Sequence, residues 1–395
     1  MAEYYMDLAR AAETGDHPVA WVSSVGPAEL LVAMGFKVFY PENHAAMLAA
    51  KRQSGRYLRR AEAIGYAPDI CSYLRSDIGA CLAGHTALSD IESTIDRLPR
   101  PSVLVYSTNQ CRDIKEWFLW HADHFEAPCI GIESPTNLDE VSMAHIDVIA
   151  SQLTDLIPHL EIAGRVRFDI DRLRETVALS KQCSTLWGEI LHLGVARPSP
   201  LSFREAVALM GPAVVMRGTD AAVALYKEVK EEIQARVTAR TGAQKNERFR
   251  VYFEGMPIWG RLTELDRRFR AVGMGQPAST YCSSWVFDAL TPDAPFESMA
   301  RAYTELFIVR SDRAKMRYLK DAVSTFGIDG ILFHEAKTCP ANSNTRYGLP
   351  ERLGTELGLP SIIIYSDHVD TDLFDQERVT TQIEAFAEQM EAQLS

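Results

Sequence analysis

Cysteine is the residue type in this sequence with the most varied chemistry, and seven cysteines occur among the 395 residues. An odd number of cysteines argues against a framework of disulfides and leaves metal binding, catalysis or simple burial. No pair of cysteines has the Cys-x-x-Cys spacing of a zinc knuckle or a ferredoxin. Spacing alone is therefore a weak signal, because most cysteines are buried as small apolar side chains.

Three cysteines differ from the others because they stand in polar, loop-like segments. Cys71 follows a Gly-Tyr-Ala-Pro turn, and Cys111 and Cys339 each follow an apolar run. Thiolates are the soft ligands that iron–sulfur clusters require, so these contexts favour metal binding over burial. The burial interpretation applies to the other four, which are Cys81, Cys129, Cys183 and Cys282.

Two serines and a glutamate follow the first two strand-like runs. Ser23 and Ser24 end the first run, and Glu42 comes shortly after the second. The serine hydroxyls either cap the next helix or hydrogen-bond a substrate. The Glu42 carboxylate can shuttle a proton if burial tunes its pKa.

The second half contributes further candidates near strand ends. His334 is either a proton donor or a buried histidine satisfied by the backbone. Glu254 is either a residue at a helix N-terminus or a substrate contact, and Trp259 either lines an apolar acyl slot or belongs to the core. Arg75 and Arg112 flank two of the cysteines, where they either tune a bound cluster or pair with local acids.

The pattern of the first 150 residues predicts the fold that positions the candidate residues of the first half. Apolar runs alternate with helical patterns there, which is typical of βαβ units around a parallel sheet. We expect a helix from about residue 27 to 34 and an aromatic-rich helix at 112–125. The expected strands lie at 17–24, 37–41, 102–107 and 129–134.

The rest of the chain divides into a helical part and a second α/β part. Residues 151–246 show helical periodicity and almost no strand signal. From residue 247 onward, strand-like runs return at 248–255, 329–335 and 360–367, and the chain ends in a helical pattern. We therefore expect an α/β protein with domains at 1–150 and 247–395, separated by a helical region at 151–246.

One motif occurs twice. Residues 104–111 (LVYSTNQC) and 331–339 (ILFHEAKTC) each combine an apolar strand, a polar loop and a cysteine. A helical pattern and another Pro-led apolar strand follow both. Ligands of such sheets bind beyond the carboxyl ends of the strands. The repeat therefore predicts two related halves that place Cys111 and Cys339 at this edge.

Composition and charge exclude several classes of protein. The net charge of −12 argues against a broad nucleic-acid-binding surface. The first residues lack the pattern of a signal peptide, and no apolar run approaches the roughly 18 residues that span a bilayer. We therefore expect a cytoplasmic protein without membrane or nucleic-acid partners. The sequence also lacks the GxxxxGK[ST] nucleotide motif.

Eight segments together carry a resemblance to a known family. They are WVSSVGPAELLVAMG, FYPENHAAM, GYAPDICSYLRSDIG, STNQCRDIKEWF, APCIGIESP, VYFEGMPIW, DGILFHEAKTC and GLPSIIIYSD. In these segments the chain resembles subunits of benzoyl-CoA reductases and 2-hydroxyacyl-CoA dehydratases. The resemblance runs over almost the whole chain and is weakest in the helical middle.

The resemblance implies a fold, a cofactor and partners. The fold is two flavodoxin-like parallel-sheet domains with a helical region. Cys71, Cys111 and Cys339 match the cysteines that bind a [4Fe–4S] cluster, and the resemblance favours Ser24 and Glu42 as contacts of an acyl-CoA substrate. Family enzymes pair two related subunits and receive the electron from a separate ATP-dependent iron–sulfur activator.

Three functions follow as hypotheses. The first is the iron–sulfur, substrate-binding subunit of a benzoyl-CoA reductase-type enzyme that adds low-potential single electrons to an acyl-CoA thioester. The second is a subunit of a 2-hydroxyacyl-CoA dehydratase, in which a ketyl radical expels the hydroxyl group. The third is a non-catalytic electron-transfer or scaffold subunit, against which a Ser24–Glu42 pocket would argue. The residues themselves do not separate the first two.

Overall fold

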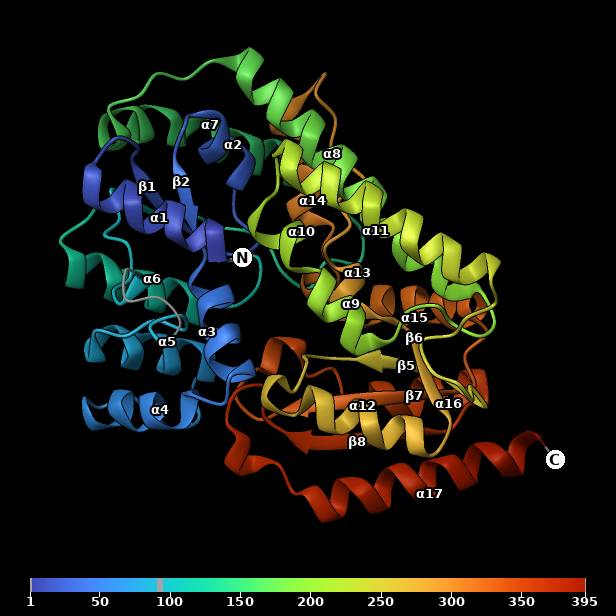
Figure 1. Cartoon of the computed structure of the whole chain (residues 1–395). Coiled ribbons are helices and arrows are strands. Elements are labelled where there is room, and N and C mark those ends of the chain that lie inside the picture. The colour runs from blue at the N-terminus through green and yellow to red at the C-terminus, as the bar shows by residue number, and fades with distance from the viewer. Residues whose placement is uncertain (1, 91–94, 395) are drawn as a thin grey trace.

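Two sheets of four parallel strands form the frame of the molecule in a computed structural model, which describes residues 2–90 and 95–394 (Figure 1). The first sheet has the order β2-β1-β3-β4 and the second the order β6-β5-β7-β8. Because both sheets wind in the same order, the expected two related α/β halves are confirmed. The strands are β1 Val19–Val22, β2 Lys37–Phe39, β3 Val103–Ser107, β4 Cys129–Ile132, β5 Phe249–Glu254, β6 Met274–Ser279, β7 Gly330–Ala336 and β8 Ser361–Ser366.

The central strands are buried on both faces, as their continuous apolar runs predict. Every residue of β1, β3, β5 and β7 is buried, and helices cover both sides of such parallel strands. Strand β6 gives no apolar run, because its sequence MGQPAS contains a glycine and a proline. It occupies the edge of its sheet, where a proline is tolerated.

Helices sandwich the first sheet (Figure 1). Alternate residues of β3 point to opposite faces: Val103 and Val105 pack with α2 and α7, whereas Leu104 and Tyr106 pack with α1 and α6. A further group of helices extends this half below the sheet. The helices of this half are α1 Ala2–Thr14, α2 Ala28–Ala33, α3 Pro41–Ala50, α4 Ser54–Ala63, α5 Ser72–Ala83, α6 Asp113–Phe125 and α7 Met143–Gly164.

The second sheet is covered in the same way. Val251 and Phe253 of β5 face the core shared with α12 and α17, and Tyr252 faces α15 and α16. Figure 1 shows α12 and α17 along the outer side of this half. The helices are α12 Leu262–Ala271, α13 Thr280–Ser283, α15 Asp312–Phe326, α16 Leu349–Leu357 and α17 Gln376–Leu394.

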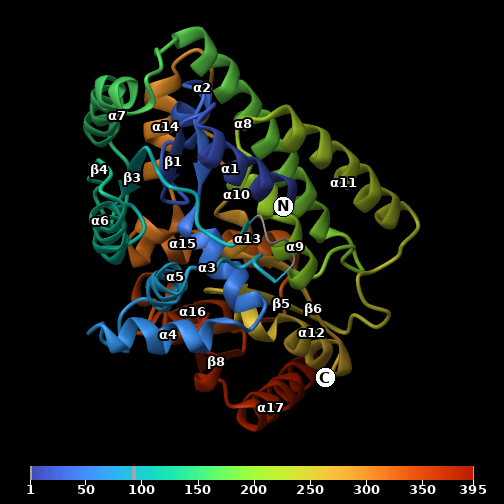
Figure 2. The same ribbon diagram turned by 60° about the vertical axis from the view of Figure 1, so that its left-hand side comes forward.

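A helical layer occupies the middle of the sequence. The long helices α8 Ile170–His192 and α11 Asp220–Thr238 pack along each other on one flank (Figures 1 and 2). Two short helices, α9 Phe203–Leu209 and α10 Gly211–Val215, lie beside them, and α14 Pro295–Thr304 packs against α7. Helix α7 crosses the expected domain limit at residue 150, and both limits, 150 and 246, stay predictions.

A buried polar cluster ties three helices of the first half together. Asp77 on α5 accepts hydrogen bonds through its two carboxylate oxygens, with His44 Nδ1 at 2.5 Å, Trp117 Nε1 at 2.8 Å and His121 Nε2 at 2.7 Å. Burial by itself would raise the pKa of Asp77, but the hydrogen bonds from His121 and His44 outweigh it and lower the pKa to about 2.

We expect Asp77→Asn to destabilise the protein by about 3 kcal/mol, because it removes one partner of a buried charged cluster. The folded-state pKa lies below the ordinary value of 3.8, so the Asp77 contribution is present above that value and is lost as the pH falls towards about 2. Urea unfolding at pH 7 and pH 3 measures both effects. Asp123→Asn, an exposed position on α6, is the control. Equal stability of the two variants at pH 7 would contradict the prediction.

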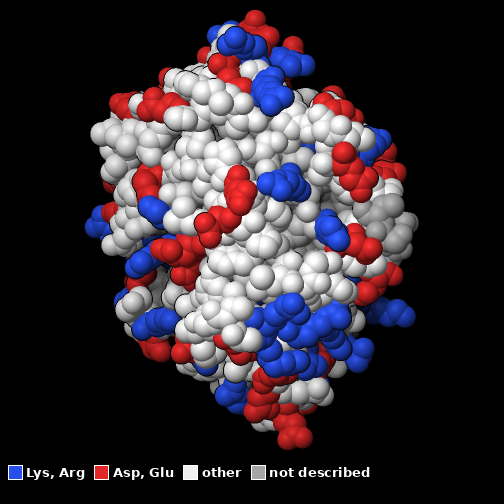
Figure 3. All heavy atoms as spheres, turned by 90° about the vertical axis from the view of Figure 1, so that its left-hand side faces the viewer, with Lys and Arg blue, Asp and Glu red and all other residues white. Residues whose placement is uncertain are grey.

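Charge is unevenly distributed on the face formed by the first half. Lys and Arg side chains gather in the lower part of this face, and its centre carries few charges (Figure 3). Five exposed basic residues lie in α4 or just before it, namely Lys51, Arg52, Arg56, Arg59 and Arg60. None of the helices in the described ranges has the length and apolarity to cross a membrane.

Candidate active site

A cavity of about 130 Å³ lies where the carboxyl edges of the two sheets meet. From the first sheet, Ser24 follows β1, Glu42 follows β2 and Cys111 follows β3. From the second sheet, Glu254 ends β5 and Cys339 follows β7. Binding crevices of doubly wound sheets lie at this edge. The two halves therefore share one site, and neither half encloses it alone.

Three cysteines line this cavity from three different segments. Cys71 is the N-cap residue of α5, Cys111 stands just before α6, and Cys339 follows β7. Strands β3 and β7 have the same place in their sheets, so Cys111 and Cys339 follow equivalent strands. All three side chains are half-buried, and the other four cysteines do not line the cavity.

The three thiols influence one another. Burial raises the pKa of Cys111 and of Cys339 to about 12, and burial with the charges of Cys111 and Cys339 raises the pKa of Cys71 well above its ordinary value. Each of these shifts favours the neutral thiol over the thiolate. Metal binding here must release protons, because thiolates are the ligating form.

In the described ranges, no group of three His, Cys, Asp or Glu side chains is arranged to hold a single metal ion. A cluster has a different requirement, because each thiolate binds a separate iron and the ligands need only surround the group. Cys71, Cys111 and Cys339 line one cavity and are therefore the candidate ligands for such a group.

Ser24, Glu42 and Gln110 form a hydrogen-bonded unit on the cavity wall. The backbone NH of Ser24 donates to Glu42 Oε2 at 2.8 Å, and Gln110 Nε2 donates to Glu42 Oε1 at 2.8 Å. Burial raises the pKa of Glu42 to about 7, and the hydrogen bonds from Ser24 and Gln110 limit the rise. A carboxyl group with this pKa is suited to proton transfer near neutral pH. Gln110 directly precedes Cys111, a position that sequence reasoning did not single out.

Neither serine after β1 caps helix α2. The N-cap residue of α2 is Pro27, and no side chain makes the capping hydrogen bond. Ser23 is fully buried and its hydroxyl accepts a hydrogen bond from the backbone NH of Ser107 at 3.0 Å. The cavity wall includes Ser24 but not Ser23. The substrate-binding role of Ser23 stays a prediction.

Glu254 lines the cavity from the second half. Its carboxylate accepts hydrogen bonds from the Thr280 hydroxyl and from Asn344 Nδ2, the latter at 2.6 Å. Burial raises the pKa of Glu254 above its usual value, against these two hydrogen bonds. Glu254 and Glu42 therefore present two carboxyl groups to one cavity.

Two further predicted residues lie behind the wall. The His334 ring is buried, its Nδ1 lies 2.6 Å from the Met256 carbonyl, and burial lowers the pKa of His334 to about 4. Trp259 begins a short 3₁₀ helix and donates to the Tyr73 hydroxyl. Neither residue lines the cavity, and their proposed contacts with the substrate stay predictions.

The two arginines beside the cysteines pair with acids. Arg75 is buried and its Nη1 lies 2.5 Å from Glu62 Oε1. Arg112 is exposed and lies 3.8 Å from Glu116. Of the two alternatives for these arginines, tuning a bound cluster or pairing with local acids, the contacts match the second.

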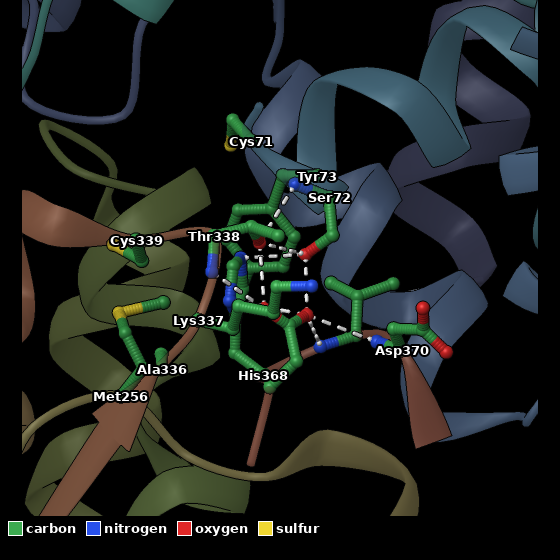
Figure 4. Close-up of polar contacts among 12 residues, drawn as sticks. Cys71, Ser72, Tyr73, Met256, Ala336, Lys337, Thr338, Cys339, His368 and Asp370 are labelled. Atoms are coloured by element: carbon green, nitrogen blue, oxygen red, sulfur yellow. Dashed lines mark hydrogen bonds and ion pairs between the residues drawn. The ribbon is translucent and has the colours of Figure 1, made fainter. Parts of the chain in front are cut away.

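A buried network joins the neighbours of Cys71 and Cys339 (Figure 4). The Ser72 hydroxyl donates to Asp367 Oδ1 and the Thr338 hydroxyl to Asp367 Oδ2, both at 2.6 Å. The Ser72 backbone NH also donates to Thr338 Oγ1 at 3.1 Å. Sequence analysis missed this network, although Asp367 follows an apolar strand as the other site residues do.

Comparisons with known proteins point to one family. A family model described as 2-hydroxyglutaryl-CoA dehydratase, D-component, matches residues 23–390. The chain is 29% identical to the (R)-2-hydroxyisocaproyl-CoA dehydratase alpha subunit of Clostridioides difficile, over 99% of this chain and 94% of the relative. It is 27% identical to the alpha subunit of the lactoyl-CoA dehydratase of Anaerotignum propionicum, over 98% and 94%. It is 25% identical to a benzoyl-CoA reductase subunit of Thauera aromatica, over 100% and 94%.

The fold and the site define an α/β protein with two parallel-sheet halves and a cavity that presents thiols and carboxyl groups. Together with the match over residues 23–390, they show that the chain belongs to the 2-hydroxyacyl-CoA dehydratase and benzoyl-CoA reductase family of enzymes. The family expected from the sequence segments is thereby confirmed. The ranking of the reductase hypothesis above the dehydratase hypothesis is not confirmed. The family model and two of these three relatives are named as dehydratases.

Proposed function

We propose that this chain is the alpha-type, substrate-binding subunit of a 2-hydroxyacyl-CoA dehydratase. The observation that carries the proposal is the single cavity that combines Cys71, Cys111 and Cys339 with Ser24 and Glu42. The dehydratase names of the family model and of two of the three relatives described above support this reaction over benzoyl-CoA reduction. The dehydratase hypothesis therefore replaces the reductase hypothesis as the leading one.

The three thiols fit a [4Fe–4S] cluster. They are the soft ligands that such a cluster takes, they come from three segments around one cavity, and they leave one iron without a protein thiolate. When bound, the cluster supplies single electrons at low potential. Cys71 and Cys111 stand at the N-termini of helices α5 and α6, where the helix dipoles favour the negative charge of thiolates.

The other wall residues have roles that their contacts suggest. We propose that the Ser24 hydroxyl donates a hydrogen bond to an oxygen of the substrate, either the thioester carbonyl or the 2-hydroxyl group. Glu42 stands beside it with a pKa of about 7 and can hold or release a proton there. Gln110 fixes the Glu42 carboxyl group in place. Apolar residues on the remaining wall exclude water from the reacting group.

The enzyme is proposed to work with partners in the cytoplasm. The three relatives are all named as subunits of larger enzymes, two of them as alpha subunits, which supports a related second subunit in the assembly. The sequence has no GxxxxGK[ST] motif, so the energy for reducing the site is proposed to come from a separate ATP-dependent iron–sulfur activator.

We expect the chain, purified anaerobically with its second subunit and supplied with the activator, ATP and a reductant, to convert (R)-2-hydroxyisocaproyl-CoA to the 2-enoyl-CoA. Loss of water causes no net oxidation or reduction, so one injected electron should support many turnovers. Product formation per electron, followed by mass spectrometry, measures this. The chain alone with ATP should be inactive. Reduction of benzoyl-CoA with electrons consumed for each product would instead support the reductase, and turnover by the isolated chain would contradict the need for partners.

A further inference from the structure

The part of the cavity wall that does not carry the thiols is mainly apolar. Among the described residues, the lining set includes no lysine and no arginine. Apart from the cysteines and His368, its ionisable members are the two carboxyl groups of Glu42 and Glu254. Apolar side chains come from several elements of both halves, including Val25, Met256, Trp285, Leu306 and Ile308.

Two buried cations lie near this wall, and both are engaged elsewhere. Lys315 Nζ donates to Asn344 Oδ1 at 2.7 Å, and Asn344 in turn donates to Glu254 at 2.6 Å. Arg217 donates to the backbone carbonyls of the loop after β1 at 3.1 and 3.2 Å, and its Nε lies 3.4 Å from Glu29. Neither side chain is part of the lining.

These charges disfavour an acidic substrate. A carboxylate that leaves water for this cavity would find no lysine or arginine on the wall, and unpaired burial of a charge is costly. It would also approach Glu42 and Glu254, and either carboxyl group repels it when ionised. An aliphatic or aromatic group, in contrast, gains from the burial of its apolar surface.

We propose that the acyl group of the substrate is uncharged and apolar, and that 2-hydroxydicarboxylic acyl thioesters are excluded. This inference rests on the proposed dehydratase function of the same cavity. It distinguishes the chain from an enzyme for 2-hydroxyglutaryl-CoA, although the matching family model is described by that name.

The test compares two thioesters on the assembled, activated enzyme. We expect kcat/KM for (R)-2-hydroxyisocaproyl-CoA to exceed that for (R)-2-hydroxyglutaryl-CoA by at least about 100-fold, since a missing charge partner in a buried site typically costs this much. Equal rates, or a preference for the glutaryl thioester, would overturn the inference and leave the dehydratase function intact. Dehydration of neither thioester would count against the proposed function.

Binding of non-reacting thioesters decides the inference even without turnover. The purified complex should bind 4-methylpentanoyl-CoA at least tenfold more tightly than glutaryl-CoA in calorimetry, and the reverse order would overturn it. Leu306→Arg adds a cation to the wall and should shift this ratio towards glutaryl-CoA by about tenfold. Leu119→Arg, at a half-exposed position on α6 outside the cavity, should leave the ratio unchanged. If Leu306→Arg does not fold, the wild-type comparison decides alone.

A second inference comes from the network of Ser72, Thr338 and Asp367. All three side chains are buried, with at most 1% of each residue exposed. Ser72 is the neighbour of Cys71 in the first half, and Thr338 is the neighbour of Cys339 in the second (Figure 4). Asp367 also accepts from the backbone NH of Thr338 at 3.0 Å. The contacts therefore join the two cysteine-bearing segments across the halves.

We propose that Asp367 is a positioning residue that, through Ser72 and Thr338, holds Cys71 and Cys339 at the separation that iron binding requires. Its carboxylate does not line the cavity, so the residue acts through its neighbours. Hydrogen bonds to an ionised carboxylate are about twice as strong as neutral ones and therefore limit movement of both segments. Partners that orient metal ligands typically contribute about 10- to 100-fold in metal affinity.

The test measures iron retention in the anaerobically reconstituted complex. Thr338→Val, which removes the hydroxyl at nearly constant volume, and Asp367→Asn should each speed iron loss to a chelator by about tenfold or more and change the electron paramagnetic resonance spectrum. Thr338→Ser should restore the wild-type rate and spectrum. Asp370→Asn is the control, because the backbone NH of Asp370 donates to Asp367 whereas its side chain accepts from the Asp372 NH instead. A lower melting temperature of Thr338→Val with unchanged iron loss would overturn the proposal.

Discussion

Replacement of Cys71, Cys111 or Cys339 by serine is expected to strip or destabilise the iron–sulfur cluster and to abolish turnover. The wild-type chain should contain about four irons, and each of these cysteines should supply one ligand. Serine is a harder and less acidic ligand than cysteine, so each substitution removes one of the three thiolate ligands that the protein supplies. Iron and sulfide content after anaerobic purification, together with the visible absorption of the cluster, measures the loss.

Two other cysteines provide matched controls for this series. Cys183 is buried on α8, and Cys129 begins β4, and neither lines the cavity. Cys129→Ser and Cys183→Ser should keep the iron content and at most lower the melting temperature, because a buried hydroxyl replaces an apolar thiol. Full iron content in the triple variant of Cys71, Cys111 and Cys339 would refute the ligand assignment.

Ser24→Ala and Glu42→Gln should each lower turnover by about 100- to 1000-fold and leave iron content unchanged. Loss of one positioned donor to a developing negative charge typically has this effect on kcat. Helix capping does not explain the serine, because α2 has no side-chain cap. Ser76→Ala is a suitable control, since Ser76 is equally buried on α5 and donates only to the Tyr73 carbonyl. Near-normal turnover of Ser24→Ala would remove Ser24 from the active site.

The pH dependence of stability offers a separate check on Glu42. Its folded-state pKa of about 7 lies above the ordinary 4.5, so the folded protein holds this proton more tightly than the unfolded chain does. The Glu42 contribution to the free energy of unfolding should therefore fall as the pH rises from about 4.5 to about 7, by up to about 3 kcal/mol. Glu42→Gln should lack this slope. Parallel pH profiles of the two proteins would show that Glu42 has an ordinary pKa.

Much of the fold can be predicted from the sequence, and the reason is visible in individual elements. The apolar runs of β3 and β7 predict strands that are buried on both faces. The repeated strand–loop–cysteine motif predicts two halves, and their sheets have the same strand order. Strand β6 could not be predicted in this way. Its position at the edge of the sheet tolerates Gly275 and Pro277, so the strand has no apolar run that would reveal it in the sequence.

Within the site, the sequence predicts positions along the chain better than it predicts contacts. Glu42 and Cys111 were expected beyond strand ends, and both line the cavity. Ser23 and Ser24 are adjacent and alike in type, yet only Ser24 reaches the cavity wall. The Ser23 hydroxyl instead accepts a hydrogen bond from the backbone NH of Ser107. Which of two neighbouring hydroxyls faces a ligand depends on packing against a strand that lies about eighty residues later.

The sequence by itself determined the chemistry that is available: soft thiols after polar loops, carboxyl groups after buried strands, and two related α/β halves of one enzyme family. These follow from local rules, because strand burial and strand-end position depend on nearby residues. Only the tertiary structure decided how the halves share one cavity, that no lysine or arginine among the described residues lines it, and that Asp367 joins the segments of Cys71 and Cys339. Such contacts join residues nearly 300 positions apart, and no local pattern encodes them because they form only when the two halves pack together.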